Sequence, residues 1–415
     1  MIGRGIVISA PASGAGKTTI TMGLLRALSE VIKVKPAKSG PDYIDPAFHQ
    51  AACGVPSVNL DAWAMEPDEL RANAATEDLL VVEGAMGLFD GAPPEGKGAT
   101  ADVARILGLP IILVVDVRSM SHSIAALVRG FRDHDPDLSI AGLILNRVGS
   151  PRHEAMLRKA LEPLNIPVIG ALPREKEVSL PSRHLGLVQA MEHPDLERVL
   201  KVLSQLVQKH IDINKIIDLS DKFEAKSVLR RHTRKRIAVA QDAAFSFTYT
   251  HDLARWAAEG ELLTFSPLAN EPVPEADEVF LPGGYPELFG GILSDANIFT
   301  DSIKEASQSI AIKGECGGYM TLGEAIVDAE GTSHKMAGLL PLVTSFEERK
   351  LHLGYRILRC SQGGSALKGH EFHYATTLRA DGTPAFDAWD AEGNALAPMG
   401  LIEGNVSGSF AHIIA

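Results

Sequence analysis

Residues 6–19 read IVISAPASGAGKTT, an apolar run followed by a glycine-rich turn and a helix-forming stretch. This is the order of a buried strand, a phosphate-binding loop and a helix whose first N–H groups face phosphate oxygens. Lys17 is expected to reach the β- and γ-phosphates, and the Thr18 hydroxyl to bind Mg2+. The match to GxxxxGK[ST] departs at its first glycine, where Pro11 stands. We therefore predict an ATP-binding loop formed by Ser13, Gly14, Ala15, Gly16, Lys17, Thr18 and Thr19.

Apolar runs and helical patterns alternate along the first half of the chain. Continuous apolar strands that alternate with helices are typical of a parallel sheet covered on both faces. This half is therefore predicted to be a doubly wound α/β domain, with its ligand site at the carboxyl ends of the strands. We expect strands at 6–10, 32–35, 79–83, 111–116, 141–146 and 166–170, and helices at 17–30, 100–107, 121–134, 151–162 and 194–209.

A polar stretch separates the two halves. It is rich in cations close to Arg236 and is typical of a solvated linker. A second α/β pattern follows, with strand-like runs that continue to the C-terminus and indicate a second open sheet of mixed strand direction. We predict a first domain at 1–212, a linker at 213–235 and a second domain at 236–415.

Composition excludes several classes of protein. The 415 residues carry a net charge of −12, which argues against a general nucleic-acid binder. Three scattered cysteines form neither a disulfide framework nor a CxxC metal site. No apolar run reaches the roughly 18 residues of a membrane helix, and the start lacks the layout of a signal peptide. We expect a cytoplasmic protein with no membrane partner, and leave a homodimer open.

Two further glycine-rich loops, SGPDYIDP and EGAMGLFDG, follow later strands and carry Asp42, Asp45, Glu83 and Asp90. Because the carboxyl ends of parallel strands meet at one edge of a sheet, we expect these carboxylates to converge near the phosphates. Oxygen ligands of this kind suit Mg2+, and they also position substrates. The competing interpretation of any single one is a turn or helix-cap residue.

Two later loops give weaker signals. Asn146 and Arg147 close a strand and could contact the nucleotide base, although a simple helix-entry loop also fits. Ser182 and Arg183 precede an apolar patch, and an ordinary polar loop is an equal alternative. We include Asn146 among the ATP contacts, and Ser182 and Arg183 among the substrate contacts.

The second half contains SIAIKGECGGYM at 309–320, in which a strand leads through Cys316 into a helix. A sharp strand-to-helix turn exposes a nucleophile, and the N–H groups that follow it face a developing oxyanion. We expect the helix start to lower the pKa of the thiol below its usual value of about 8.5. Gly317 and the glycines of LPGGYPE, Gly283 and Gly284, are the expected oxyanion-hole donors.

A thiol nucleophile needs a base. His412 lies at the end of an apolar strand near the C-terminus and is our choice. His370 and His373, in GHEFHY, are the alternatives. An ionisation near the usual histidine value of about 6.5 is then expected in the pH profile of the reaction at Cys316.

Eight motifs follow one another along the chain: APASGAGKTT, SGPDYIDPAFH, VEGAMGLFDG, LNRVGSPRH, SRHLGLVQA, LPGGYPE, GECGGYM and GHEFHY. In this order they resemble one family, the cobyrinic or hydrogenobyrinic acid a,c-diamide synthases. The resemblance covers nearly the whole chain and implies an N-terminal P-loop domain similar to dethiobiotin synthetase. It also implies a C-terminal class I glutamine amidotransferase domain with a flavodoxin-like fold. The implied activity is ATP-dependent amidation of the a and c acetate carboxylates of a corrin ring, through acyl phosphates, with ammonia from glutamine.

The resemblance assigns roles to particular residues. Cys316 becomes the glutaminase nucleophile and His412 its base, although the glutamate that triad glutaminases usually carry two residues later is Ile414 here. The acidic loops become the ATP, Mg2+ and corrinoid site. Their implied residues are Asp45 in catalysis, Asp42, Tyr43, Ile44 and Asp90 in substrate binding, and Thr18, Asp42 and Glu83 at the metal.

Two other readings compete with this one. A partition-type ATPase would use nucleotide as a switch, but such proteins usually carry an additional lysine where Ala12 stands, and they do not need GECGG. Cobyric acid synthases amidate other side chains of the same ring, and their phosphate-loop region generally differs from SGPDYIDP.

Overall fold

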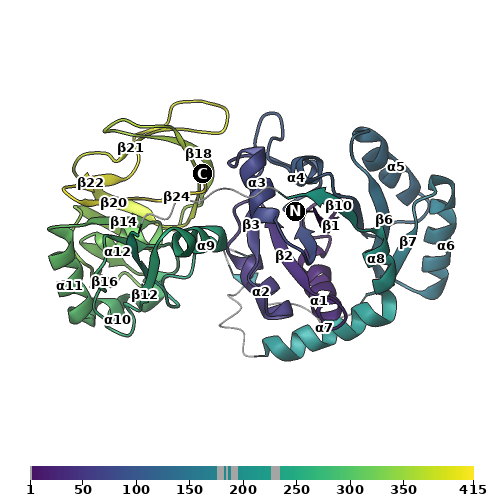
Figure 1. Ribbon diagram of the computed structural model, residues 1–415, viewed down its shortest axis with the longest axis horizontal. Coiled ribbons are helices and arrows are strands. Elements are labelled where there is room, and N and C mark those ends of the chain that lie inside the picture. The colour runs from purple at the N-terminus through teal and green to yellow at the C-terminus, as the bar shows by residue number, and fades with distance from the viewer. Residues whose placement is uncertain (1, 175–181, 184–185, 188–194, 226–233) are drawn as a thin grey trace. The chain divides into compact units, whose positions relative to one another are not determined.

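The computed structural model describes residues 2–174, 182–183, 186–187, 195–225 and 234–415. The chain divides into two compact units, Met1–Val228 and Leu229–Ala415 (Figure 1). Each unit has its own central sheet and its own buried core. Among helices in the described ranges, none combines the length and the apolar character needed to cross a bilayer.

An eight-stranded sheet forms the centre of the first unit. Its order is β3-β2-β4-β1-β5-β6-β7, with parallel neighbours, and β10 pairs antiparallel with β1. The strands are β1 (Ile2–Ser9), β2 (Val34–Ser39), β3 (Val58–Leu60), β4 (Leu79–Glu83), β5 (Ile111–Asp116), β6 (Ile140–Val148), β7 (Val168–Pro173) and β10 (Asp221–Glu224). The helices are α1 (Lys17–Ser29), α2 (Ile44–Cys53), α3 (Pro67–Ala74), α4 (Thr100–Leu107), α5 (Ile124–His134), α6 (Pro151–Leu161), α7 (Leu196–His210) and α8 (Ile213–Leu219).

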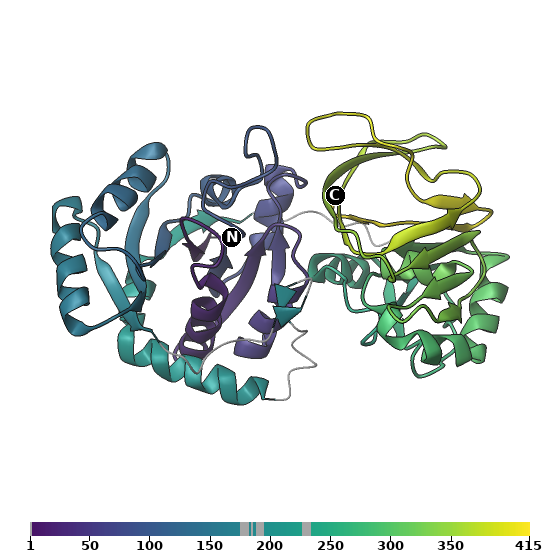
Figure 2. The same cartoon turned by 180° about the vertical axis from the view of Figure 1, so that it is seen from behind.

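Both faces of this sheet are buried, as the apolar strands predict. Successive side chains of β1 point to opposite faces. Ile8 belongs to the cluster that includes α1 and α7, whereas Val7 points to the other face and is equally buried. Helices α1 and α7 lie side by side (Figures 1 and 2), and a Cβ at Gly23 would lie only 2.7 Å from Cγ2 of Val207. Polar side chains therefore gather at the strand ends.

Part of the expected linker belongs to the first unit. Residues 213–224 form α8 and β10, and the Asp212 carboxylate accepts the Lys215 N–H at 2.9 Å at the start of α8. β10 pairs with the first half of β1, and Phe223 is buried there. The polar composition concealed this short strand because only one of its four residues faces the core.

A six-stranded sheet in the order β12-β11-β13-β14-β23-β22 forms the centre of the second unit. Its first four pairs are parallel and β22 is antiparallel to β23, which gives the expected mixed sheet. The strands are β11 (Arg236–Ala240), β12 (Glu261–Phe265), β13 (Glu278–Leu281), β14 (Ala311–Glu315), β22 (Leu401–Glu403) and β23 (Val406–Ser409). The helices are α9 (Thr250–Glu259), α10 (Gly290–Asp295), α11 (Asn297–Ser307) and α12 (Gly317–Leu322).

The later strands do not all join that sheet, so the expectation of a single sheet was incomplete. Two additional four-stranded sheets have the orders β16-β15-β17-β20 and β21-β18-β19-β24. Periodicity in sequence indicates a strand but does not identify its partner. The strands are β15 (Ala325–Val327), β16 (Ser333–Lys335), β17 (Leu342–Ser345), β18 (His352–Cys360), β19 (Leu367–His373), β20 (Thr376–Ala380), β21 (Phe386–Trp389) and β24 (Ala411–Ile413).

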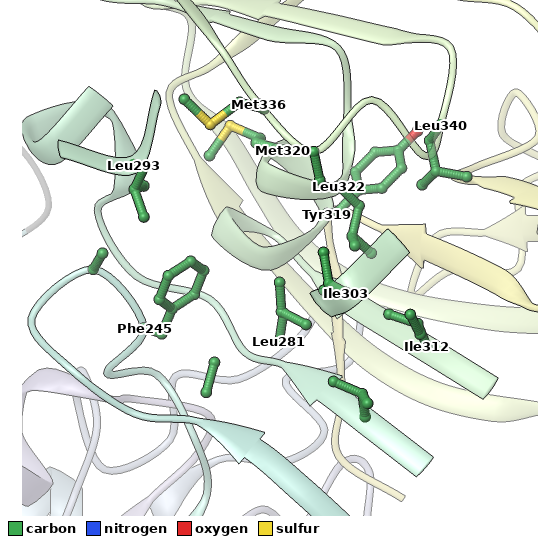
Figure 3. Packing of buried hydrophobic residues seen from close by; sticks show 14 of the residues in the cluster. Phe245, Leu281, Leu293, Ile303, Ile312, Tyr319, Met320, Leu322, Met336 and Leu340 are labelled. Carbon is green, nitrogen blue, oxygen red and sulfur yellow. The ribbon is translucent and has the colours of Figure 1, made fainter. Parts of the chain in front are cut away.

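The core of the second unit fixes the turn between β14 and α12. Tyr319 and Met320 of α12 are buried in one cluster with Leu281 of β13 and Ile312 of β14 (Figure 3). A Cβ at Gly318 would lie 1.9 Å from the carbonyl oxygen of Leu281, so α12 packs on β13 at a distance that only glycine permits. This close packing holds the six-residue helix rigidly at the strand end.

Candidate active sites

The glycine-rich loop of the first unit has the backbone form expected for phosphate binding. Gly14 and Gly16 have φ values of 76° and 94°, in the region that favours glycine, and α1 begins at Lys17. The Asn146 amide donates to the Ala15 carbonyl at 2.8 Å, and a Cβ at Gly16 would lie 2.3 Å from that amide nitrogen. Asn146 therefore braces the loop, a contact that the expectation of base binding did not include.

Lys17 is folded into the loop. Its side chain is largely buried, and its ammonium donates to the carbonyls of Met86 and, at 3.5 Å, Ala12. Burial and the nearby charge of Lys38 lower the pKa of Lys17. Phosphate oxygens would be stronger partners than these two carbonyls for the same ammonium.

A buried cluster of charges lies beside Lys17 at the carboxyl ends of β2 and β4. The Thr18 hydroxyl donates to Glu83 Oε1 at 2.6 Å and to Asp45 Oδ2 at 3.3 Å. Lys38 forms ion pairs with Asp45 and, at 3.1 Å, with Glu83. His49 binds the other Glu83 oxygen at 2.6 Å. Two of the predicted loops thus meet at the predicted edge.

The pKa values of Asp45 and Glu83, the two carboxyl groups of this cluster, are shifted in opposite directions. Burial and the charge of Asp42 raise the pKa of Asp45 to about 7, although Lys38 opposes them. Burial also acts on Glu83, but Lys38 and the bond from His49 outweigh it and hold the pKa of Glu83 well below its usual range. Asp45 and Glu83 likewise raise the pKa of Lys38 against burial. Glu83 is therefore a fixed anion, and Asp45 can exchange a proton near neutrality.

The donor set fits a divalent cation. Thr18 Oγ1, Asp45 Oδ2 and Glu83 Oε1 are hard oxygen donors linked by hydrogen bonds, the ligand type that Mg2+ prefers. Asp42, which the sequence placed at the metal, uses Oδ1 to accept the N–H groups of Ile44 and Asp45 at 2.8 and 3.2 Å. Its other oxygen lies 3.9 Å from the Lys38 ammonium.

The remaining predicted substrate residues lie at the start of α2, in the loop after β4 and on β8. Tyr43 is half-buried at the start of α2, and Ile44 packs partly against the hydrophobic core. Asp90 is exposed and accepts the Gly87 N–H at 2.9 Å. Ser182 and Arg183 form the two-residue strand β8, which pairs with β9 (Gly186–Leu187).

Sequence reasoning missed two residues of the charge cluster. Lys38 lies on β2, just before the first acidic loop, and its position opposite Glu83 follows from the pairing of β2 with β4. His49 is fully buried on α2, where Nδ1 lies 3.1 Å from the Ser57 hydroxyl. The signal for α2 was the Asp-x-x-Asp-Pro pattern, in which the first Asp accepts N–H groups at the helix start.

Cys316 has the strained backbone of a nucleophile elbow. Its φ is 47° and its ψ is −105°, between β14 and α12, and its N–H donates to the Ser409 carbonyl at 2.8 Å. The side chain is 3% exposed. Burial and the charge of Glu287 raise the pKa of the thiol, although the Gly317 N–H opposes them. The expected lowering of this pKa was wrong, because burial outweighs the start of so short a helix.

His412 lies beside this thiol. A Cβ at Gly283 would lie 3.3 Å from Cβ of Cys316 and 3.1 Å from Nε2 of His412, so the two side chains converge on this glycine. Burial, then the charges of His370 and His373, lower the pKa of His412 to about 3. The imidazole is neutral at neutral pH and can accept the thiol proton. The ionisation expected near 6.5 does not belong to this histidine.

The expected oxyanion-hole glycines surround the same position. The Gly284 nitrogen lies 3.0 Å from the point that a Gly317 Cβ would occupy, so the two backbones are in close contact. The Gly283 carbonyl accepts the Phe247 N–H at 3.0 Å, which ties the loop after β13 to the rest of the unit. The three expected glycines, Gly283, Gly284 and Gly317, therefore lie next to the nucleophile.

The alternative histidines have other partners. His373 stacks on Phe410 with ring centroids 3.9 Å apart, and its Nε2 lies 2.9 Å from Glu371 Oε1. With His352 these two groups could contribute to a metal site, since their ligand atoms lie within 4.8 Å of one another. Arg356 already binds the second oxygen of Glu371 at 2.7 Å, so this carboxylate has a partner on each oxygen.

Comparisons with known proteins identify the family of each domain. Residues 6–188 match the CobQ/CobB/MinD/ParA nucleotide binding domain, and residues 236–415 match the CobB/CobQ-like glutamine amidotransferase domain. The fold and these matches define a two-domain, glutamine-dependent ligase that uses a nucleotide. The chain is 52% identical to the hydrogenobyrinate a,c-diamide synthase of Brucella anthropi, over 99% of this chain and 98% of that protein. It is 49% identical to that of Rhodobacter capsulatus, over 99% of both. It belongs to the hydrogenobyrinate a,c-diamide synthase family.

Proposed function

We propose that this chain converts the a and c acetate carboxylates of hydrogenobyrinate to amides, with ATP as the activating agent and glutamine as the nitrogen source. The observation that carries the proposal is the presence in one chain of a phosphate loop with a buried charge cluster and of a Cys–His pair on a nucleophile elbow. The amidotransferase domain disfavours the partition-type ATPase. Relatives that match across the whole chain disfavour cobyric acid synthase.

The first unit activates the carboxylate. A carboxylate is a poor acyl donor because oxide would have to leave, so its oxygen takes the γ-phosphoryl group of ATP to give an acyl phosphate and ADP. Ammonia then attacks the acyl carbon and inorganic phosphate leaves. Lys17 stabilises the charge on the transferred phosphoryl group, and Asp45 positions the substrate and holds a proton near neutrality. We assign the contacts with the corrinoid substrate to the residues of the surrounding loops, which are Asp42, Tyr43, Ile44, Asp90, Ser182 and Arg183.

Mg2+ completes this site. Thr18 and Glu83 would hold the ion, with Asp42 or Asp45 as a further ligand, because these oxygens belong to one hydrogen-bonded cluster. When bound, the ion neutralises charge on the phosphate oxygens. Lys38 then has two functions: it balances the carboxylates before the ion arrives, and it supports the negative phosphates afterwards.

The second unit releases ammonia. The Cys316 thiol gives its proton to neutral His412, and the sulfur attacks the amide carbon of glutamine. His412 returns the proton to the departing nitrogen as the C–N bond breaks, which leaves a thioester and ammonia. Water hydrolyses the thioester to glutamate. The N–H groups of Gly284 and Gly317 face the oxyanion of each tetrahedral intermediate.

A direct assay tests the assignment. The protein is incubated with hydrogenobyrinate, ATP, Mg2+ and glutamine, and products are resolved by mass spectrometry. Two successive decreases of about one mass unit, each with consumption of one ATP and one glutamine, are expected. Cobyrinate in parallel reactions shows whether the corrin metal matters. Absence of any mass change, or change only in an a,c-diamide offered as substrate, contradicts the proposal.

His412→Ala is expected to lower glutamine hydrolysis by roughly 10²–10⁴-fold, the usual contribution of general-base catalysis. Amidation supported by added ammonium salt should stay near normal, because activation occurs in the other unit. His370→Ala and His373→Ala should have milder effects. In the wild type, loss of the base at acid pH should follow the pKa of about 3 rather than 6.5. If His412→Ala hydrolyses glutamine at the full rate and His373→Ala does not hydrolyse it, the base is His373 on β19 and not His412.

A further inference from the structure

The last residue of β14 is a partly buried glutamate that the proposed function leaves without a role. Glu315 immediately precedes Cys316, and 15% of its side chain is exposed. Its Oε1 accepts the Ile413 N–H at 3.1 Å, and its Oε2 lies 3.6 Å from Nδ1 of His412. The carboxylate therefore contacts β24 at the histidine and at the residue that follows it.

The two ring nitrogens of His412 face different groups. Nε2 is directed to Gly283 and the Cys316 side of the site, whereas Nδ1 is directed to Glu315. A base that takes a proton at one nitrogen works best when a third group holds the proton on the other. The distance of 3.6 Å is that of an ion pair rather than a hydrogen bond. Catalytic contacts of this kind commonly shorten when substrate binds.

The carboxylate of Glu371, whose charge also acts on His412, is already committed. Glu371 binds His373 at 2.9 Å through one oxygen and Arg356 at 2.7 Å through the other. Two residues after His412, where triad glutaminases usually carry a glutamate, the apolar Ile414 is buried. Glu315 therefore offers a carboxylate to His412 from a different strand.

We propose that Glu315 is the positioning residue of the glutaminase site, which holds His412 with Nδ1 protonated and stabilises the imidazolium formed when Cys316 attacks glutamine. This inference rests on the proposed function, because it concerns the same Cys–His pair. Glu315 touches neither glutamine nor the reacting atoms and acts through His412. Its bond to Ile413 adds a second restraint on the strand that carries the base.

The surroundings of Glu315 give the proposal a pH signature. Burial raises the pKa of Glu315 to about 8; Asp252 adds to this effect, and the Ile413 N–H and Lys313 oppose it. His412 is the titratable group that faces it from β24. The ionised carboxylate presents two acceptor oxygens and a negative charge that stabilises the imidazolium, whereas the protonated form lacks that charge, so glutamine hydrolysis should increase as pH rises through this ionisation.

The decisive variant is Glu315→Gln, which keeps an oxygen for the Ile413 N–H and replaces the charged oxygen that faces Nδ1 with a neutral amide nitrogen. We expect kcat for glutamine hydrolysis by the full chain to fall roughly 10²-fold with little change in KM. The increase in rate as pH rises through the Glu315 ionisation, which forms the rising limb of the pH profile, should disappear. Glu315→Asp should retain the limb and part of the rate. Glu278→Gln is the matched control, because Glu278 starts β13 and binds Lys235 and Lys313 at the other end of the same sheet.

Two readouts separate this proposal from the one on which it rests. Absence of wild-type glutamine hydrolysis would contradict the glutaminase assignment itself. Wild-type rate and an unchanged pH profile in Glu315→Gln would overturn the positioning role alone. Equal loss of ammonia-dependent amidation in Glu315→Gln would also overturn it, since that result indicates general misfolding. A loss of the limb in Glu371→Gln instead would assign the role to Glu371.

Discussion

Lys17→Ala should lose amidation with either nitrogen source, by at least about 10³-fold in kcat, the scale of removing a charged group from a phosphoryl-transfer site. Acyl activation precedes attack whether ammonia comes from glutamine or from added ammonium salt, so both routes need this lysine. Glutamine hydrolysis measured alone should survive at least in part, because its residues lie in the other unit. Product masses and glutamate release, measured on the same sample, check both expectations.

Lys35→Ala is the matched control for this variant. Lys35 is a partly buried lysine whose pKa is also lowered by burial, and its ammonium donates to the carbonyls of Asn73 and Ala75 at 2.8 and 2.9 Å. It lies on β2 outside the charge cluster, so its loss should lower stability more than turnover. Full ammonia-dependent amidation by Lys17→Ala would show that Lys17 is not the phosphate ligand.

The local sequence was sufficient to predict the phosphate loop and the turn that carries Cys316. The phosphate loop and the elbow at Cys316 could be predicted because strand, turn and helix are consecutive in each case, and the glycines mark where backbone must approach closely. Strands β4, β5, β11 and β12 and helix α4 begin and end at the residues expected from their apolar pattern.

The contacts that the sequence could not indicate are those between strands that lie far apart along the chain. Lys38 meets Glu83 because β2 and β4 pair with those two residues in register. Glu315 meets His412 because β24, which belongs to a different sheet, places its Ile413 N–H on the carboxylate at the end of β14. Residues more than 40 positions apart give no periodic signal of such contacts.

Burial also reversed one expected property. The helix start at Cys316 suggested a thiolate, but the side chain is almost fully enclosed and its pKa is raised. With a neutral His412 beside it, the pair in the ligand-free site is a thiol and an imidazole rather than an ion pair. Proton transfer from the thiol to the imidazole then accompanies attack on glutamine.

Because Cys316 is protonated before it reacts, Cys316→Ser is expected to abolish activity with glutamine. A serine hydroxyl is less acidic than a thiol, so the same neutral imidazole cannot activate it to a comparable extent. Glutamine-dependent amidation should fall below detection, whereas ammonia-dependent amidation should be retained, because the phosphate loop and charge cluster belong to the other unit. Parallel assays with glutamine and with ammonium salt, at matched ATP and hydrogenobyrinate, measure the two activities.

Cys360→Ser provides the control for thiol loss without loss of the nucleophile. Cys360 is a free, partly buried cysteine at the end of β18, with none of the elbow geometry of Cys316, and its replacement should leave both activities within about twofold. Trapping adds a positive test: a glutamine analogue with an electrophilic carbon should label the wild type and Cys360→Ser at one site, and should leave Cys316→Ser unlabelled. If a folded Cys316→Ser protein loses both nitrogen routes, the two units do not divide the reaction as proposed. If it retains glutamine-dependent synthesis, the nucleophile lies elsewhere.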